Sequence, residues 1–85
     1  MKQTYFVYIL ECKDATLYTG IATDVERRFE EHKRGEGAKY TRAHKPVKIV
    51  YKKKVGNRSL AQKREAEIKK FPRTKKLALI RELCS

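Results

Sequence analysis

Residues 18 to 32 read Tyr-Thr-Gly-Ile-Ala-Thr-Asp-Val-Glu-Arg-Arg-Phe-Glu-Glu-His, and the rest of the chain can be interpreted around them. The stretch predicts the end of a strand, a tight turn and an amphipathic helix that starts near Asp24. Thr23 is placed to cap this helix, and Glu26 follows three residues later, where it can bond back to the backbone of Thr23. A capping box is therefore expected at the start of the helix.

Three side chains of this stretch suit phosphate chemistry. Arg28 and His32 are four residues apart and therefore share one face of the predicted helix. Tyr18 arrives on the preceding strand, so a phenol, a guanidinium and an imidazole can converge on one concavity. Arginine offers a planar fork to a phosphate, while the other two groups can move or orient protons. Taken alone, His32 fits a helix-end histidine stabilised by the helix dipole at least as well.

The segment before this stretch predicts a β-hairpin. Residues 4 to 11 are rich in β-branched and aromatic side chains without interruption, which is typical of a strand covered on both faces. Residues 12 to 16 supply a polar turn, and residues 17 to 20 form the second strand. The hairpin brings Tyr8 and Tyr18 toward the same end of the sheet. From its strand alone, Tyr8 would be interpreted as a packing aromatic.

The segment after the helix is glycine-rich and basic. Residues 34 to 46 predict a loop with one helical turn over residues 39 to 42. Tyr40 and His44 alternate with basic residues, a pattern that suits stacking on a base or sugar. A tyrosine that merely covers the sheet explains the pattern equally well, and both interpretations stay open.

Residues 47 to 54 predict a third strand, in which Val47, Ile49 and Tyr51 share one face. Helices are expected over residues 59 to 71 and 74 to 83, the first opened by a capping box of Ser59 and Gln62. The expected apolar face of that first helix consists of Leu60, Ala61, Ile68 and Phe71.

Glu65 falls on this inward face, four residues after Ala61 and three before Ile68. A carboxylate there is costly unless it is paired, protonated or bound to a cation. A salt bridge to a nearby Lys or Arg is the competing structural interpretation of Glu65.

The chain resembles the GIY-YIG nuclease family. The family pattern is two tripeptides about ten residues apart, here Val7-Tyr8-Ile9 and Tyr18-Thr19-Gly20, followed by a helix with matching Arg28 and His32. The family carboxylate on a later helix corresponds to Glu65. The resemblance covers nearly the whole chain and is greatest to the small stand-alone branch of the family. It implies an α/β fold of the α+β type, in which about three helices flank a small three-stranded antiparallel sheet.

The resemblance also implies a chemistry, namely hydrolysis of DNA phosphodiester bonds in repair or recombination. Glu65 would be the protein ligand of one Mg²⁺ or Mn²⁺ ion, a hard ion that keeps most of its waters at phosphate sites. Arg28 would stabilise the transition state. Tyr8 or Tyr18 would help to remove the proton from the attacking water, with His32 orienting one of them or sharing the transfer. Which tyrosine acts stays open.

Two positions depart from the pattern. Some family members have a Lys directly after the second tripeptide, where this chain has Ile21, and many have an Asn on the helix after the carboxylate. The only Asn of this chain is Asn57, which precedes that helix.

Charge supports a polyanionic partner. The 85 residues carry a formal net charge of +12, divided into +1 over residues 1 to 42 and +11 over residues 43 to 85. Nucleic acid, with DNA first, is the partner that such a charge favours. The side chains expected to bind it are Lys39, Tyr40, Arg42, Lys45, Lys69 and Lys70.

The remaining composition limits the alternatives. The length predicts one domain over residues 1 to 85, monomeric by default. Cys12 and Cys84 match no metal or disulfide spacing, and the chain has no apolar run of membrane-spanning length, so a cytoplasmic protein with free thiols is expected. A non-catalytic nucleic-acid-binding module and a ribosome-associated or RNA-associated basic protein are the competing functions.

Overall fold

The computed structural model describes the backbone of residues 3–84 and the side chains of residues 3–82. The elements in chain order are β1 (Tyr5–Cys12), β2 (Leu17–Ala22), α1 (Val25–Lys33), α2 (Lys39–Ala43), β3 (Pro46–Gly56), α3 (Arg58–Lys69) and α4 (Arg73–Cys84). The described residues thus form the predicted α+β fold with a three-stranded antiparallel sheet, and the expected helical turn in the basic loop is the short helix α2.

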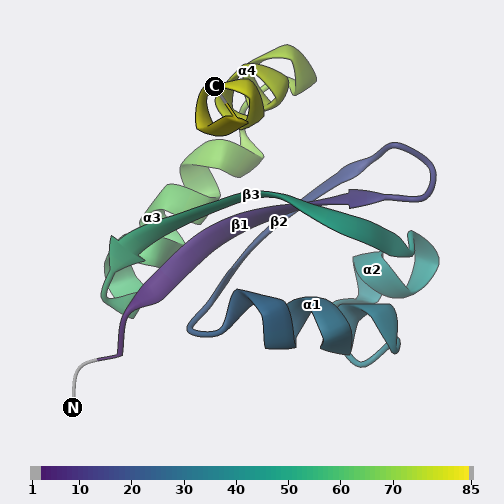
Figure 1. The fold of residues 1–85 in the computed structure, drawn as a ribbon. Helices are drawn as coiled ribbons and strands as arrows, with labels where there is room; N and C mark the ends of the chain where they lie inside the picture. Colours follow the sequence, from purple (N-terminus) through teal and green to yellow (C-terminus); the bar gives the residue numbers. More distant parts are fainter. Residues whose placement is uncertain (1–2, 85) are drawn as a thin grey trace.

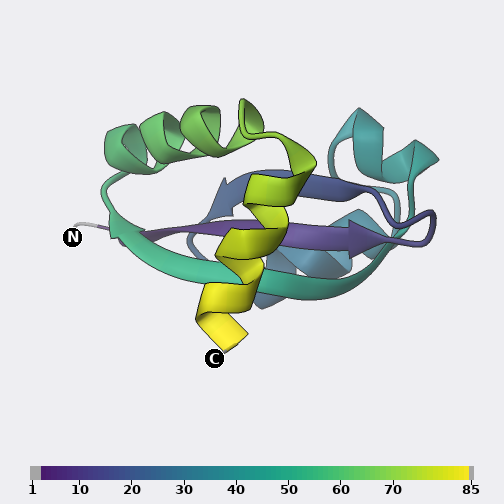
Figure 2. The same ribbon diagram turned by 90° about the horizontal axis from the view of Figure 1, so that it is seen from above.

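The sheet has the strand order β2-β1-β3, with β1 antiparallel to both neighbours. Helix α1 covers one face of this twisted sheet, and α3 and α4 cover the other (Figure 1). Strand β1 is therefore buried on both faces, as its unbroken apolar run predicted, and residues 7 to 10 are at most 1% exposed. Strand β2 forms one edge of the sheet, where α2 and the end of α3 lie on the same side in Figure 2.

Each face of the sheet has its own core. On the α3 face the buried residues are Val7, Ile9, Tyr51 and Ile68. On the α1 face they are Tyr8, Leu10 and Val25. Side chains alternate along a strand, so β1 contributes odd-numbered residues to one core and even-numbered residues to the other. This alternation places Tyr8 against α1, the helix that carries the predicted Arg28 and His32.

A β-bulge changes the facing of β3. Ile9 pairs with Tyr51, whereas the next residue, Leu10, pairs with Ile49, so Val50 is an extra residue in the ladder. The prediction that Ile49 and Tyr51 share a face is therefore wrong, because the bulge sends them into different cores. A strictly alternating pattern cannot reveal a bulge.

Two apolar residues expected inside are exposed. Val47 on β3 and Leu60 on α3 are 56% and 51% exposed. Leu60 lies in the first turn of α3, beside a hollow that Val7 and Val55 also line. Of the two cysteines, Cys12 is a free buried thiol, and the side chain of Cys84 lies outside the described residues.

Both predicted capping boxes are wrong by one or two residues. Asp24, not Thr23, caps α1, and its carboxylate accepts a hydrogen bond from Arg27 N at 3.1 Å. Asn57, not Ser59, caps α3 by accepting from Leu60 N at 2.9 Å. In each case a second good capping residue stands close to the expected one, and the turn geometry selects between them.

Candidate active site at the β2 edge

A buried hydrogen-bonded chain connects β1, α1 and α2. The Tyr8 hydroxyl lies 2.9 Å from His32 Nε2, and His32 Nδ1 lies 2.7 Å from Thr41 Oγ1. Thr41 donates its own hydroxyl proton to the Ala38 carbonyl at 2.9 Å, so it accepts from Nδ1–H of the imidazole. The bare Nε2 then accepts from the Tyr8 hydroxyl. The network thus selects one tautomer of His32, and each of its three side chains is 1% exposed.

Two glycines make room for this chain. Gly20 faces Tyr8 across the β1–β2 ladder, and a Cβ on Gly20 would lie 2.5 Å from the Tyr8 hydroxyl oxygen. A Cβ on Gly37 would overlap the imidazole ring of His32. The second tripeptide therefore ends in glycine to admit a ring, and Gly37 has the same role on the other side of the pair. Neither Gly37 nor Thr41 was predicted from the sequence as part of the site.

Burial keeps both titratable members neutral. Desolvation, and then the nearby Arg28 charge, lower the pKa of His32 from 6.5 to about 4. Desolvation and the neighbouring Tyr18 raise the pKa of Tyr8 above its usual value, and the Arg28 guanidinium opposes this rise less strongly. A neutral phenol that donates to a neutral imidazole agrees with the hydrogen-bond directions.

Arg28 borders the buried chain and is partly open to solvent. Its Nη1 lies 3.0 Å from the Glu31 carboxylate, and its side chain is 37% exposed. Both residues line a hollow of about 270 Å³ between the start of α1 and the end of β2. The charge of Arg28 acts on both Tyr8 and His32, so the structure brings these predicted residues together.

Tyr18 begins a row of rings that leaves the site along the β2 edge. Its ring meets His32 edge-on at 5.2 Å between centroids. Tyr40 stacks on Tyr18 at 5.7 Å, and His44 stacks on Tyr40 at 4.4 Å. Both faces of Tyr40 are therefore covered by neighbouring rings, although the residue is 38% exposed.

Glu65 reaches this edge from the opposite face of the sheet. Its carboxylate pairs with the Lys69 ammonium at 3.2 Å, and its side chain is 21% exposed, so it is only partly inward. Lys69 also lies 6.0 Å from the ring centroid of Tyr18. The negative charge of Glu65 contributes to the raised pKa of Tyr8. The salt bridge weighed as the alternative for Glu65 thus exists, and Glu65 still lies near the tyrosines.

A single carboxylate limits which metal can bind. No group of three or more His, Cys, Asp or Glu gathers among the described side chains, so a closed cage of protein ligands is absent there. A hard ion that keeps most of its waters needs only one or two carboxylates, and Glu65 fits such an ion. Its partner Lys69 is half exposed and can swing aside.

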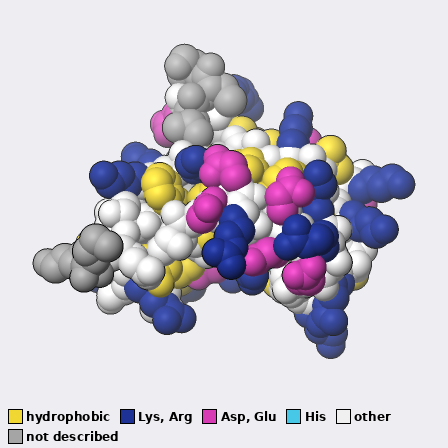
Figure 3. All heavy atoms as spheres, turned by 60° about the horizontal axis from the view of Figure 1, so that its bottom comes forward, with side chains coloured by type: hydrophobic (Ala, Val, Ile, Leu, Met, Phe, Trp, Pro, Cys, Tyr) yellow, Lys and Arg dark blue, Asp and Glu magenta, His cyan; other side chains and the backbone are white. Residues whose placement is uncertain are grey.

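The six predicted nucleic-acid contacts flank the site. Four of them lie on or directly after α2, and two lie at the end of α3, all with exposed side chains. Figure 2 shows these two elements on the β2 side of the sheet. The α1 side is different, because acidic and basic side chains are interspersed there (Figure 3), and its carboxylates form ion pairs with Arg and Lys.

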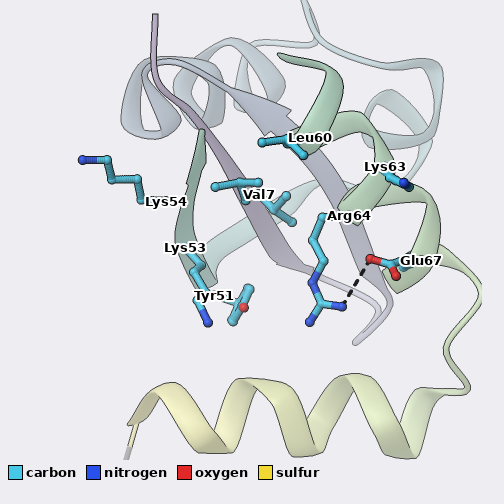
Figure 4. Close-up of a pocket in the computed structure, with 9 residues that line it drawn as sticks. Val7, Tyr51, Lys53, Lys54, Leu60, Lys63, Arg64 and Glu67 are labelled. Atoms are coloured by element: carbon cyan, nitrogen blue, oxygen red, sulfur yellow. Dashed lines mark ion pairs between the residues drawn. The ribbon is translucent and has the colours of Figure 1, made fainter. Parts of the chain in front are cut away.

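Another hollow lies away from these residues. It has a volume of about 380 Å³ and lies between β3 and α3, with Val7 and Leu60 projecting into it and α4 nearby (Figure 4). Lys53, Lys54 and Arg64 stand around it, and none of the predicted site residues lines it.

Comparison with known proteins points to one family. The family model described as the GIY-YIG catalytic domain matches residues 4–78. The UPF0213 proteins SAV0488 and SA0446 of two Staphylococcus aureus strains are each 53% identical over 79 residues, which span 93% of this chain and 96% of the relative. The solution structure of UPF0213 protein BH0048 from Bacillus halodurans is 44% identical, with a TM-score of 0.57 over 91% of this chain and 82% of that one.

No helix among the described residues is both long and apolar enough to cross a membrane. The family model, the relatives and the solved structure all cover most of the chain, and the likeness to the solved structure supports the α+β architecture. The chain belongs to the GIY-YIG family.

Proposed function

We propose that this protein is a nuclease that hydrolyses phosphodiester bonds of DNA. The observation that carries the proposal is the buried hydrogen-bonded chain from Tyr8 through His32 to Thr41. Arg28 lies beside the Tyr8 end of this chain. Burying three polar side chains costs free energy unless each of their hydrogen bonds is formed. Apolar side chains at these positions would avoid that cost, so the polar chain favours a functional role. Membership of a family defined by its catalytic domain supports the same function.

The proton path follows from the tautomer. As a water attacks phosphorus, its proton passes to the Tyr8 oxygen while the phenolic proton passes to His32 Nε2. The new bond is between the water oxygen and phosphorus, and the bond from phosphorus to the sugar oxygen breaks. That oxygen takes a proton from solvent, and the imidazolium later loses its extra proton to solvent. Tyr8 is thus a relay that is never a free phenolate before the reaction, consistent with its raised pKa.

Arg28 is the residue placed to meet the phosphate. Its guanidinium bonds to Glu31 at a partly exposed position, where a phosphate can compete for the same N–H groups. Movement of Arg28 toward a phosphate would also open the side of Tyr8, which is 1% exposed in the free protein. Stabilising the charge of the transition state is worth about 3 to 4 kcal/mol for one well-placed donor.

Glu65 is the residue that would hold a divalent ion, Mg²⁺ or Mn²⁺. Such an ion would supply Lewis-acid stabilisation of the phosphate and of the leaving oxygen. The Glu65 carboxylate must leave Lys69 to bind a cation, and the freed Lys69 ammonium then lies beside Tyr18, on the side where a nucleic-acid backbone would pass. The positive half of the sequence and the basic ends of α2 and α3 support DNA as the partner. A role in repair or recombination is part of this proposal.

The test is cleavage of labelled single-stranded, duplex and branched DNA with Mg²⁺, with Mn²⁺ and with EDTA. We expect metal-dependent cutting that falls about 100-fold to 1000-fold in Arg28→Ala and is lost in Glu65→Gln. Arg27→Ala is the matched control, because Arg27 is the next residue of α1, is exposed and pairs with the same Glu31. It should change the rate less than about twofold.

Two results would contradict the proposed site. Cutting that survives both Arg28→Ala and Glu65→Gln would come from elsewhere in the protein or from a contaminant. Binding without cutting on every substrate would make the protein a non-catalytic DNA-binding module.

A further inference from the structure

A second hollow lies at the end of the row of rings. It has a volume of about 350 Å³ and separates the β1–β2 turn from the end of α2. Its lining consists of Lys13, Asp14, Arg42, Ala43, His44 and Lys45. Three of these six side chains are cations and one is an imidazole, so the hollow suits a ligand with both a negative group and a flat ring.

The walls of this hollow are held together across 30 residues of sequence. His44 Nδ1 lies 2.5 Å from the Asp14 carboxylate, whose other oxygen accepts from the Thr16 hydroxyl at 2.7 Å. The backbone N–H of Lys13 donates to the Lys45 carbonyl at 2.8 Å. The hollow is therefore formed before any ligand arrives, which lowers the ordering cost of binding.

The row of rings joins this hollow to the candidate active site. The row runs from His32 through Tyr18 and Tyr40 to His44 in centroid steps of 5.2, 5.7 and 4.4 Å. Because Tyr18 and His44 cover both faces of Tyr40, a base cannot stack there without displacing a ring. The next stacking position in the row belongs to His44, which lines the hollow.

The chemistry of the lining selects an unpaired nucleotide. Lys13, Arg42 and Lys45 can hold a phosphate, and the Asp14 carboxylate can accept from an amino group of a base. A base can stack on an imidazole only after it leaves the duplex stack, so paired DNA cannot fill the hollow in this way. We propose that this hollow is a subsite for an unpaired nucleotide of the DNA that the candidate active site cuts. The substrate class is then single-stranded DNA or branched DNA with a single-stranded arm.

This inference rests on the proposed function for its link to cleavage, but its test is a binding measurement. The probe is a short single-stranded oligonucleotide that contains 2-aminopurine, compared with the same sequence as a duplex, in EDTA so that no cutting occurs. Fluorescence anisotropy of an end label gives the affinity, and quenching of 2-aminopurine reports stacking. We expect tighter binding of the single strand, with quenching.

Three variants separate stacking from charge. His44→Ala should weaken single-strand binding about tenfold, remove the quenching and leave duplex binding unchanged. His44→Phe keeps a stacking ring but loses the bond to Asp14, and it should restore quenching. Lys53→Ala, which removes one lysine from the hollow between β3 and α3, is the charge-matched control for Lys13→Ala. Lys13→Ala should weaken binding of the single strand by more than Lys53→Ala does.

The subsite would be overturned if His44→Ala weakened the binding of single-stranded and duplex DNA equally. It would also be overturned if the wild-type protein did not quench 2-aminopurine. If the single strand binds as described but no DNA is cut, the nuclease proposal fails and the subsite remains. If DNA is cut at rates that His44→Ala leaves unchanged on every substrate, the nuclease proposal stands and the subsite is wrong.

Discussion

The β2 edge and the hollow between β3 and α3 represent two ways in which this small protein builds a concave surface. The larger one, about 380 Å³, has an apolar floor, exposed lysines and a long ion pair of 3.6 Å between Arg64 and Glu67. The β2 edge has smaller hollows but contains Tyr8 and His32, which are buried, hydrogen-bonded and strongly shifted in pKa. Titratable groups whose pKa values are shifted by burial and by neighbouring charges indicate a functional site better than the volume of a hollow does.

The difference also concerns how each region is stabilised. Around the β3–α3 hollow, apolar packing predominates, with Val7 and Tyr51 buried and Leu60 half exposed. At the β2 edge the polar groups of three elements satisfy one another, so each depends on the others. Substitutions should therefore have large effects at the β2 edge and small effects at the other hollow.

The largest effect is expected at Gly37. An added methyl group would overlap the imidazole of His32, which is 1% exposed and would lose its hydrogen bonds to Tyr8 and Thr41 if it moved. We expect Gly37→Ala to lower the free energy of unfolding by about 3 kcal/mol, measured by urea denaturation. Ala43→Gly, at the exposed end of α2, is a control for a change of similar size, and a loss as large there would show that the whole segment is fragile.

A somewhat smaller effect is expected from pH. The pKa of His32 is about 4 when folded and about 6.5 when unfolded, so the unfolded chain binds more protons between these values. The stability that neutral His32 contributes is therefore fully present above about pH 6.5 and is lost as the pH falls toward 4. Between pH 7 and pH 5 the free energy of unfolding should fall by about 2 kcal/mol.

The control for this prediction is His32→Gln, which should have a flatter profile over the same range. The carboxyl groups with lowered pKa values, Asp14, Glu26 and Glu31, keep their stabilising contribution above about pH 5 and lose it mainly below that pH, outside the range compared. An equal pH dependence in His32→Gln would assign the effect to another group.

A change of about tenfold in kcat is expected when Thr41 is replaced. Thr41→Val removes the oxygen that accepts from His32 Nδ1–H while keeping the shape of the side chain. The imidazole then loses the bond that selects its tautomer, so kcat should fall about tenfold with KM unchanged. Thr41→Ser should restore kcat. The ring nitrogen shifts of His32 in NMR spectra should show Nδ1 protonated in wild type and a mixture of tautomers in Thr41→Val.

The smallest effect is expected at the other hollow. Leu60 is 51% exposed, so Leu60→Ala should lower the free energy of unfolding by less than about 0.5 kcal/mol and leave DNA cleavage unchanged. A clear loss of cleavage in this variant would show that the β3–α3 hollow takes part in the reaction and that the contrast between the two regions is wrong.

Local patterns predicted most of the fold. The hairpin, the third strand and the helices follow from side-chain periodicity and turn residues, which act over a few positions. The exact caps did not follow, because Thr23 and Asp24 are both good capping residues and only the turn geometry decides. The bulge at Val50 depends on pairing with β1 and has no signature in the alternation of β3 itself.

The candidate site was predictable only in part, because the motif positions can be identified in the sequence, whereas contacts from other segments cannot. The resemblance pointed to Tyr8, Tyr18, Arg28, His32 and Glu65, and the structure places them around one edge of the sheet. The contributions of Gly37 and Thr41 come from the α1–α2 loop and from α2, which pack against His32 of α1. Their signal was a small residue and a hydroxyl four positions apart in a basic segment, which many ordinary loops also contain.

The bulge at Val50 has a consequence for how this chain can vary in length. Upstream of it β3 presents Ile49 to one core, and at Tyr51 it presents a side chain to the other. Deleting Val50 would remove the bulge and leave both neighbouring pairs and the facing of the strand unchanged. Deleting a residue from the regularly paired stretch after Val50 would instead exchange inside and outside for part of that stretch. Length changes during evolution should therefore collect in the turns and at Val50, while the paired positions of this strand keep their number even where their side chains are replaced.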